Sequence, residues 1–234
     1  MASYPREVID AHRALAVAGQ ADLVWGHVGV RDPDGRGVWT KAAGWGLEEV
    51  DGDRLVLVSP EGEQILGSGR RHIECFIHTE VMNARQEINV TVHTHAAAAI
   101  SFAALDVPML PLSHDAIPFL GPDVARYTAS GDLIKDAGRG AALAGFLGDT
   151  PGCVIPGHGL VTVGRDAAEA IMRAVLLERA CRVQLEALAA GEVRRWSSEA
   201  EVRDKRSGLW PRPQFEAGYS YLVRRAETLY GPVS

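Results

Sequence analysis

The chain has 234 residues, of which 47% are hydrophobic and 23% charged. This near-average composition excludes disordered and fibrous architectures. The formal net charge of -6 gives no overall attraction to nucleic acid or to an anionic membrane.

No apolar run is long enough for a transmembrane helix, and the charged N-terminal segment is unlike a signal peptide. Three scattered cysteines, an odd number, argue against a disulfide framework. We therefore expect a cytoplasmic protein with no membrane or nucleic-acid partner.

The first half of the chain is predicted to combine helices with short strands. Apolar residues at helical spacing predict a helix over residues 6–19. Strand-like runs separated by glycine turns follow over residues 24–66, with a hairpin turn at residues 60–62. We expect a helix from about Ile73 to Arg85, then a strand over residues 88–95 and a helix leaving it.

The second half continues the alternation. A proline-rich irregular stretch (residues 107–123) precedes a helix near 136–148, a strand-like run over 152–164 and a long helix over 165–190. Such alternation predicts one α/β domain with a layered sheet, spanning residues 1–234 without a linker. We expect residues 194–234 to form a C-terminal extension at a subunit interface. The arginine-rich stretch within it is more typical of a solvated helix face than of a nucleic-acid site.

Three histidines are candidate metal ligands. His93 and His95 alternate on a predicted strand, so both imidazoles can face one point. His158 lies between two glycines that let the backbone approach closely. Neutral imidazole suits Zn, Mn, Co or Fe, and three such ligands leave a coordination position open for catalysis. The alternative is a set of surface and turn histidines without a ligand.

Glu74 stands in an apolar context near the start of a predicted helix. A partly buried carboxylate beside a cation can act as a general acid or base. A first-turn glutamate that only favours the helix dipole is the alternative.

In this order, the motifs resemble those of the class II aldolase/adducin-head family over essentially the whole chain. The matching stretches are GHVGVR, the spacing from Glu74 to His78, VHTHAAAA, and PGHGLVTVGRDAAEA with the helix that follows. The resemblance implies that His93, His95 and His158 bind one divalent metal ion per subunit and that Glu74 is the catalytic acid/base. It also implies a single-domain, three-layer fold with a central, mostly antiparallel sheet flanked by helices, and a homotetramer with active sites between subunits.

The chain departs from the sugar-phosphate members of that family where they hold phosphate with asparagine, serine and threonine. Those places carry His27, Gly29, the stretch Lys41–Gly44, His72 and Ile73. Cationic and imidazole side chains there, together with a site lined by tryptophan, favour a planar substrate with several negative charges. The residues are His27, Lys41, Arg70, Arg71 and His72, with Trp25, Trp39 or Trp45. The alternative is that the arginines face solvent and the tryptophans fill the core.

This altered pattern is similar to a branch of the family that decarboxylates hydroxylated aromatic or heteroaromatic dicarboxylates. We therefore expect a carboxy-lyase for a small anionic aromatic substrate, in which the metal stabilises an enolate-like charge and Glu74 protonates carbon. His114 is a second candidate proton-transfer group, or a structural histidine. Tyr219, like Tyr221, is a candidate to reach a neighbouring subunit's site, or to pack at the interface. A sugar-phosphate aldolase or epimerase is the runner-up, and a non-catalytic, adducin-like assembly domain is the third hypothesis.

Overall fold

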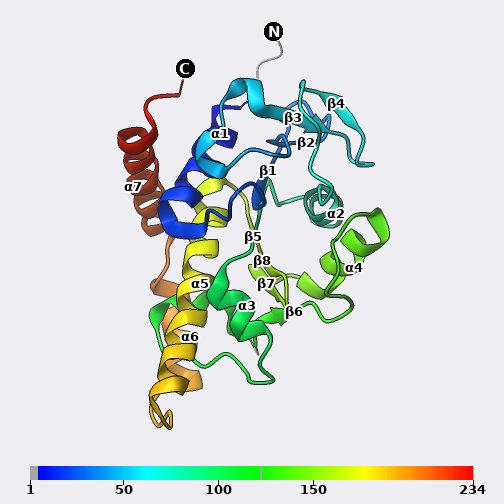
Figure 1. Cartoon of the computed structure of the whole chain (residues 1–234). Helices are drawn as coiled ribbons and strands as arrows, with labels where there is room; N and C mark the ends of the chain where they lie inside the picture. The colour runs from blue at the N-terminus through cyan, green and yellow to red at the C-terminus, as the bar shows by residue number, and fades with distance from the viewer. Residues whose placement is uncertain (1–4, 122, 234) are drawn as a thin grey trace.

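The computed structural model describes residues 5–121 and 123–233 as a mixed α/β fold built on one eight-stranded sheet (Figure 1). The strands run in the order β4-β3-β2-β1-β5-β8-β7-β6, and every pair is antiparallel except β6 with β7. Their bounds are β1 His27–Arg31, β2 Val38–Lys41, β3 Leu55–Val58, β4 Gln64–Leu66, β5 Val90–Thr94, β6 Ala125–Arg126, β7 Gly152–Ile155 and β8 Gly159–Gly164. The expected fold class, a mostly antiparallel sheet flanked by helices, is confirmed.

Helices cover both faces of this sheet, so the fold has three layers (Figure 1). Helices α1, α3 and α5 pack on one face, and α2 and α4 on the other. The helices are α1 Arg6–Leu15, α2 Phe76–Ala84, α3 Ala97–Ala103, α4 Ala137–Leu147, α5 Ala167–Ala190, α6 Glu199–Gly208 and α7 Arg212–Tyr230.

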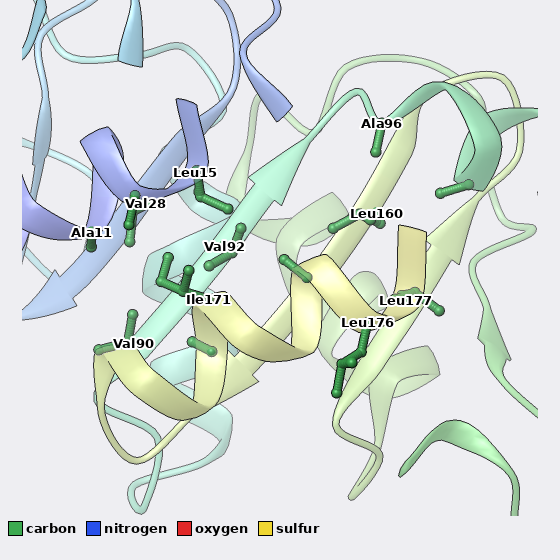
Figure 2. Packing of buried hydrophobic residues seen from close by; sticks show 14 of the residues in the cluster. Ala11, Leu15, Val28, Val90, Val92, Ala96, Leu160, Ile171, Leu176 and Leu177 are labelled. Carbon is green, nitrogen blue, oxygen red and sulfur yellow. The ribbon is translucent and has the colours of Figure 1, made fainter. Parts of the chain in front are cut away.

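Side chains alternate between the two faces along the central strands, as the pleat of a strand requires. Val90 and Val92 of β5 join the buried cluster beneath α1 and α5, where Ile171 of α5 lies against them (Figure 2). The intervening Thr91 and His93 therefore point toward α2. This alternation delivers polar side chains to one side of a largely apolar strand.

The elements expected from the sequence are present, with local differences. The run over residues 152–164 is a hairpin of two strands, because residues 156–158 form a turn. The helix expected from Ile73 begins at Phe76, after a turn. The stretch 107–123, expected to be irregular, contains the 3₁₀ helix η4 (His114–Phe119).

The C-terminal residues form two helices. Ser198 caps α6 with a reciprocal bond to Glu201. Helix α7 packs on α1 and α5 of its own chain, and its buried residues are Phe215, Leu222 and Ala226. A role of residues 194–234 at a subunit interface stays a prediction. Within the described residues, no helix combines the length and the apolar character needed to cross a membrane.

Candidate metal centre

Four side chains predicted to act together meet at one end of the central strands. His93 is the fourth residue of β5, His95 follows just after that strand, and His158 ends the turn between β7 and β8. Glu74 lies in the turn before α2. One potential ligand atom from each residue lies within 4.8 Å of the others.

Glycine allows the two histidine-bearing segments to come together. A Cβ atom on Gly159 would lie 2.2 Å from the carbonyl oxygen of Thr94, which immediately precedes His95. A side chain at this position would therefore separate β8 from the end of β5. The close approach that the glycines beside His158 suggested is thus present in the fold.

The hydrogen bonds of two histidines determine which ring nitrogen is protonated. His93 Nδ1 lies 3.0 Å from the carbonyl oxygen of Leu160, and His95 Nδ1 lies 2.7 Å from Oδ2 of Asp22. Because a carbonyl and a carboxylate only accept hydrogen bonds, each Nδ1 donates and each Nε2 keeps its lone pair. Both Nε2 atoms, and both ring nitrogens of His158, are buried without a hydrogen-bond partner among the described residues.

Charge at the centre is carried by Glu74. Burial by itself raises the pKa of Glu74, but the close contact with His158 and the neighbouring His93 outweigh it and lower that pKa to about 2. Its Oε1 lies 3.3 Å from His158 Nε2 and accepts a hydrogen bond from the backbone N–H of Ile134 at 2.9 Å. Burial also holds the pKa of His93 well below its usual range. At neutral pH the centre therefore presents the Glu74 carboxylate beside the neutral imidazole of His93.

This donor set fits a divalent metal ion. Three imidazoles converge with buried nitrogens that otherwise lack partners, which is costly unless a cation accepts their lone pairs. The Asp22 carboxylate behind His95 is the kind of outer partner that orients a metal-binding histidine. His93, His95 and His158 would hold the ion, with Glu74 beside it.

A cavity of about 730 Å³ opens onto this centre. Glu74, His95 and His158 contribute to its wall. The remaining lining is partly cationic and partly apolar: Asp22, Val24, Trp25, Ala43, Gly44, Arg70, Arg71, His72, Ile73, Ile100, Leu133 and Gly157. Of the substrate-binding residues expected from the sequence, Arg71 and His72 are in this lining.

Lys41 does not face the cavity, which corrects the expectation that it holds a substrate carboxylate. Its buried Nζ donates to the carbonyl oxygens of Val24 and Trp45, at 2.7 and 2.8 Å. Burial lowers the pKa of Lys41 to about 8. The lysine ties together the two loops that carry Trp25 and Gly44 to the cavity wall.

His27 lies beneath the cavity wall, with its ring centroid 4.2 Å from that of His72 and 5.2 Å from that of His93. Of the tryptophans, Trp25 lines the cavity. Trp39 is instead a core residue, and Trp45 packs under the guanidinium of Arg54.

Two further candidates lie outside this cavity. His114 is exposed at the start of η4, and its carbonyl oxygen accepts a hydrogen bond from the indole of Trp210. Tyr219 is largely buried on α7, where burial and then the carboxylates of Asp10 and Glu7 raise the pKa of its hydroxyl. Neither touches the centre of its own chain, and a reach of Tyr219 into a neighbouring subunit stays a prediction.

Asp22 and the backbone of Ile134 contact the candidate centre, and the sequence did not predict either contact. Asp22 is separated by 73 positions from His95, and no motif around it signals the contact. Ile134 contributes only its main-chain N–H to Glu74, a role that any residue except proline can fill.

Comparison with known proteins agrees with this geometry. The family model described as the class II aldolase and adducin N-terminal domain matches residues 6–185. The chain therefore belongs to that family, which includes metal-dependent lyases and whose members are commonly oligomeric and act on small molecules.

Among characterised relatives, 3,4-dihydroxyphthalate decarboxylase of Terrabacter sp. (strain DBF63) is 28% identical over 207 residues, covering 79% of this chain and 81% of the relative. Decarboxylase NovR of Streptomyces niveus is 34% identical over 148 residues, 62% of this chain and 52% of that protein. A solved structure, L-fuculose 1-phosphate aldolase from Glaciozyma antarctica PI12, superposes with a TM-score of 0.83 and 28% identity, covering 96% of this chain and 88% of the other.

Proposed function

We propose that this chain is a divalent-metal-dependent decarboxylase of a hydroxylated aromatic or heteroaromatic dicarboxylate. The observation that carries the proposal is the cavity wall beside the metal centre. Arg70, Arg71 and His72 are part of this wall, and the wall lacks the hydroxyl side chains with which sugar-phosphate members of the family bind phosphate. Flat guanidinium groups match carboxylates, and the indole of Trp25 offers a planar apolar surface to a ring. The similarity to two decarboxylases supports the same reading.

The proposed reaction starts from the ionised state of the Glu74 carboxyl group. His93, His95 and His158 would hold a divalent cation, which would supply Lewis acidity for charge that develops on substrate oxygen. The Glu74 carboxylate, ionised at neutral pH, accepts the proton of a ring hydroxyl and then returns it to the ring carbon that bears the departing carboxylate. The bond to CO2 breaks, its electron pair restores the aromatic ring as a phenolate, and solvent supplies the final proton.

Product analysis on the metal-reconstituted protein tests the proposal. We would offer 3,4-dihydroxyphthalate and 3-hydroxy-2-methylpyridine-4,5-dicarboxylate, and measure CO2 together with the remaining acid. Stoichiometric CO2 from one of them is expected. An Arg70→Gln variant should raise KM for that acid, while Arg224→Gln on the distant α7, which makes the same change in charge, should not.

A sugar-phosphate aldolase is the second candidate, favoured by the structural similarity to L-fuculose 1-phosphate aldolase over nearly the whole chain. In that case Arg70 and Arg71 would bind phosphate. Cleavage of a sugar phosphate without CO2 release from either aromatic acid would establish this reading and overturn the first. The buried, unpartnered metal-binding nitrogens count against an assembly domain without catalysis.

A further inference from the structure

The arginines of the cavity wall belong to a loop without regular structure. Residues 67–72 connect β4 to the turn before α2, and three successive residues of this loop, Arg70, Arg71 and His72, line the cavity. Because β4 is the edge strand of the sheet, no further strand continues the ladder beyond it (Figure 1). The shape of the loop must therefore come from side-chain hydrogen bonds and close packing.

One side chain, that of Gln64 in β4, makes three hydrogen bonds to the main chain of this loop. Its Nε2 donates to the carbonyl oxygens of Gly67 and Gly69, at 3.0 and 2.7 Å. Its Oε1 accepts a hydrogen bond from the backbone N–H of Arg71 at 2.9 Å. A primary amide has two N–H groups and one carbonyl oxygen, so every polar group of Gln64 is used. The loop is thereby folded around a residue of the strand that it leaves.

A glycine lets the same loop lie directly on the residues that follow β2. A Cβ atom added to Gly69 would lie 2.5 Å from Cβ of Ala42, a contact that only glycine avoids. Next to it, the carbonyl oxygen of Arg70 accepts a hydrogen bond from the backbone N–H of Ala43 at 2.8 Å. The main chain is therefore held at Gly69, Arg70 and Arg71 in succession, and Gln64 provides two of these three bonds.

The two arginines of the loop differ in what holds their side chains. The Nη1 atom of Arg71 donates to Sγ of Cys75 and to the carbonyl oxygen of His72, both at 3.2 Å. The Arg71 guanidinium also lies 5.5 Å from the ring centre of Phe76, within the range of a cation–π contact. Arg70 is exposed at the cavity, and its guanidinium has no hydrogen bond or ion pair to any described residue. Its five N–H donors are therefore available to a ligand.

We propose that Gln64 is a positioning residue for anion binding, which orders the loop so that Arg70 presents its guanidinium to a carboxylate of the substrate. Gln64 does not line the cavity, so it acts through the loop. A residue on a disordered loop loses conformational freedom when it binds a ligand, and this loss is smaller where the loop is already ordered. The carboxylate as the ligand rests on the proposed function. The role of Gln64 does not, because a phosphate would pair with the same guanidinium.

The ordering of the loop is tested without a ligand. Gln64→Met keeps the length of the side chain and removes all three hydrogen bonds. Gln86→Met is the matched control, because Nε2 of Gln86 also donates to two main-chain carbonyl oxygens, those of Met82 and Asn83. Hydrogen exchange at the Arg71 amide should become faster by roughly threefold or more in Gln64→Met and should not change in Gln86→Met. An equal rate in Gln64→Met and the wild type would overturn the proposal.

The link from Gln64 to Arg70 is tested by a double-mutant cycle. Calorimetry measures the Kd of phthalate for the zinc-reconstituted protein. Arg70→Gln should raise this Kd by roughly tenfold or more, the effect of losing a hydrogen bond to a charged group. Gln64→Met should raise it by roughly threefold or more, but should add little in a protein that already carries Arg70→Gln. Two effects that simply multiply would show that Gln64 does not act through Arg70, and would overturn the proposal.

Inorganic phosphate, used as a second probe, separates this proposal from the proposed function. If the wild type binds phosphate but not phthalate, and the cycle with phosphate shows the same coupling, the aromatic substrate is wrong and the role of Gln64 is supported. If the wild type binds phthalate and the two effects multiply, the substrate class is supported and the role of Gln64 is wrong. A wild type that binds neither anion would overturn both.

Discussion

Asp22 and His95 are joined by a 2.7 Å contact between a carboxylate oxygen and Nδ1 of the imidazole. The contact protonates His95 on the side away from the metal centre and turns its Nε2 toward His93 and His158. A residue outside the ligand set therefore controls whether one ligand is ready to bind.

The first prediction concerns this outer partner. Asp22→Asn should weaken zinc binding about 10- to 100-fold, because the amide can also donate to Nδ1 and thereby favour the wrong tautomer. Competition with a chelator measures the affinity. Asp106→Asn makes the same chemical change on the exposed surface and should leave affinity unchanged. Equal affinities for Asp22→Asn and wild type would show that the contact does not tune the centre.

The second prediction separates catalysis from metal binding. Glu74→Gln keeps an oxygen for the N–H of Ile134 but cannot accept a proton. Turnover should fall by at least about 10²-fold, the lower range for loss of a general acid/base, with metal content near that of the wild type. Full activity in this variant would remove Glu74 from the mechanism.

His93→Ala is expected to differ from Glu74→Gln, because it removes a ligand. Metal content, measured by elemental analysis, and activity should both be lost. A variant that still holds a full complement of metal would exclude His93 from the ligand set.

The third prediction concerns Lys41. Lys41→Met keeps most of the apolar stem but removes the bonds to Val24 and Trp45, so we expect a loss of about 1–3 kcal/mol in the free energy of unfolding and a higher KM. Lys135→Met, at an exposed position, is the matched control.

The pH dependence of the Lys41 effect has a definite sign. The folded-state pKa of about 8 lies below the ordinary value of 10.5, so the unfolded chain binds more protons between these values. Stability from this residue therefore rises with pH across that window. Urea unfolding at pH 7.5 and pH 10 should show that the free energy of unfolding of the wild type increases relative to that of Lys41→Met. A difference between the two proteins that becomes smaller at pH 10 would contradict the lowered pKa.

The fourth prediction lies far from the centre, in the turn between β1 and β2. Hydrogen bonds from Arg36, and then from the indole of Trp39, lower the pKa of the buried Asp32 to about 2. Asp32→Asn should cost about 1–3 kcal/mol of stability at pH 7 without changing metal content.

The contribution of Asp32 to the free energy of unfolding should also depend on pH. A carboxyl whose pKa is depressed on folding stabilises the protein above its unfolded pKa, near 4, and loses this contribution as pH falls toward 2. Urea midpoints at pH 7 and pH 3 measure it. The difference between wild type and Asp32→Asn should shrink at pH 3, and a difference of constant size would rule out the depressed pKa.

Local patterns in the sequence predicted the elements that carry the centre. The β-branched run around His93 and the long apolar helix after His158 are encoded by neighbours in the chain, and the structure contains both. The four clustered residues could be predicted from the sequence for the same reason, since each stands near the end of a recognisable element.

The direction in which a side chain points could not be predicted from the sequence in this way. Lys41 and His72 both appeared as cations near the site, yet one is bound to loop carbonyls and the other lines the cavity. That difference depends on how loops far apart in sequence pack together. The contact between Asp22 and His95 is missed for the same reason.

The three histidines come from two separate stretches of the chain, and the carboxylate behind one of them from a third. An unfolded chain cannot hold the whole set together, so an ion that needs all of these atoms binds the folded state much more tightly than the unfolded one. At a free ion concentration 100 times the Kd, this linkage adds about 2.7 kcal/mol to the free energy of unfolding. The melting temperature should then rise with the metal supply, and the amount of folded protein in a cell would follow the availability of the ion as closely as its activity does.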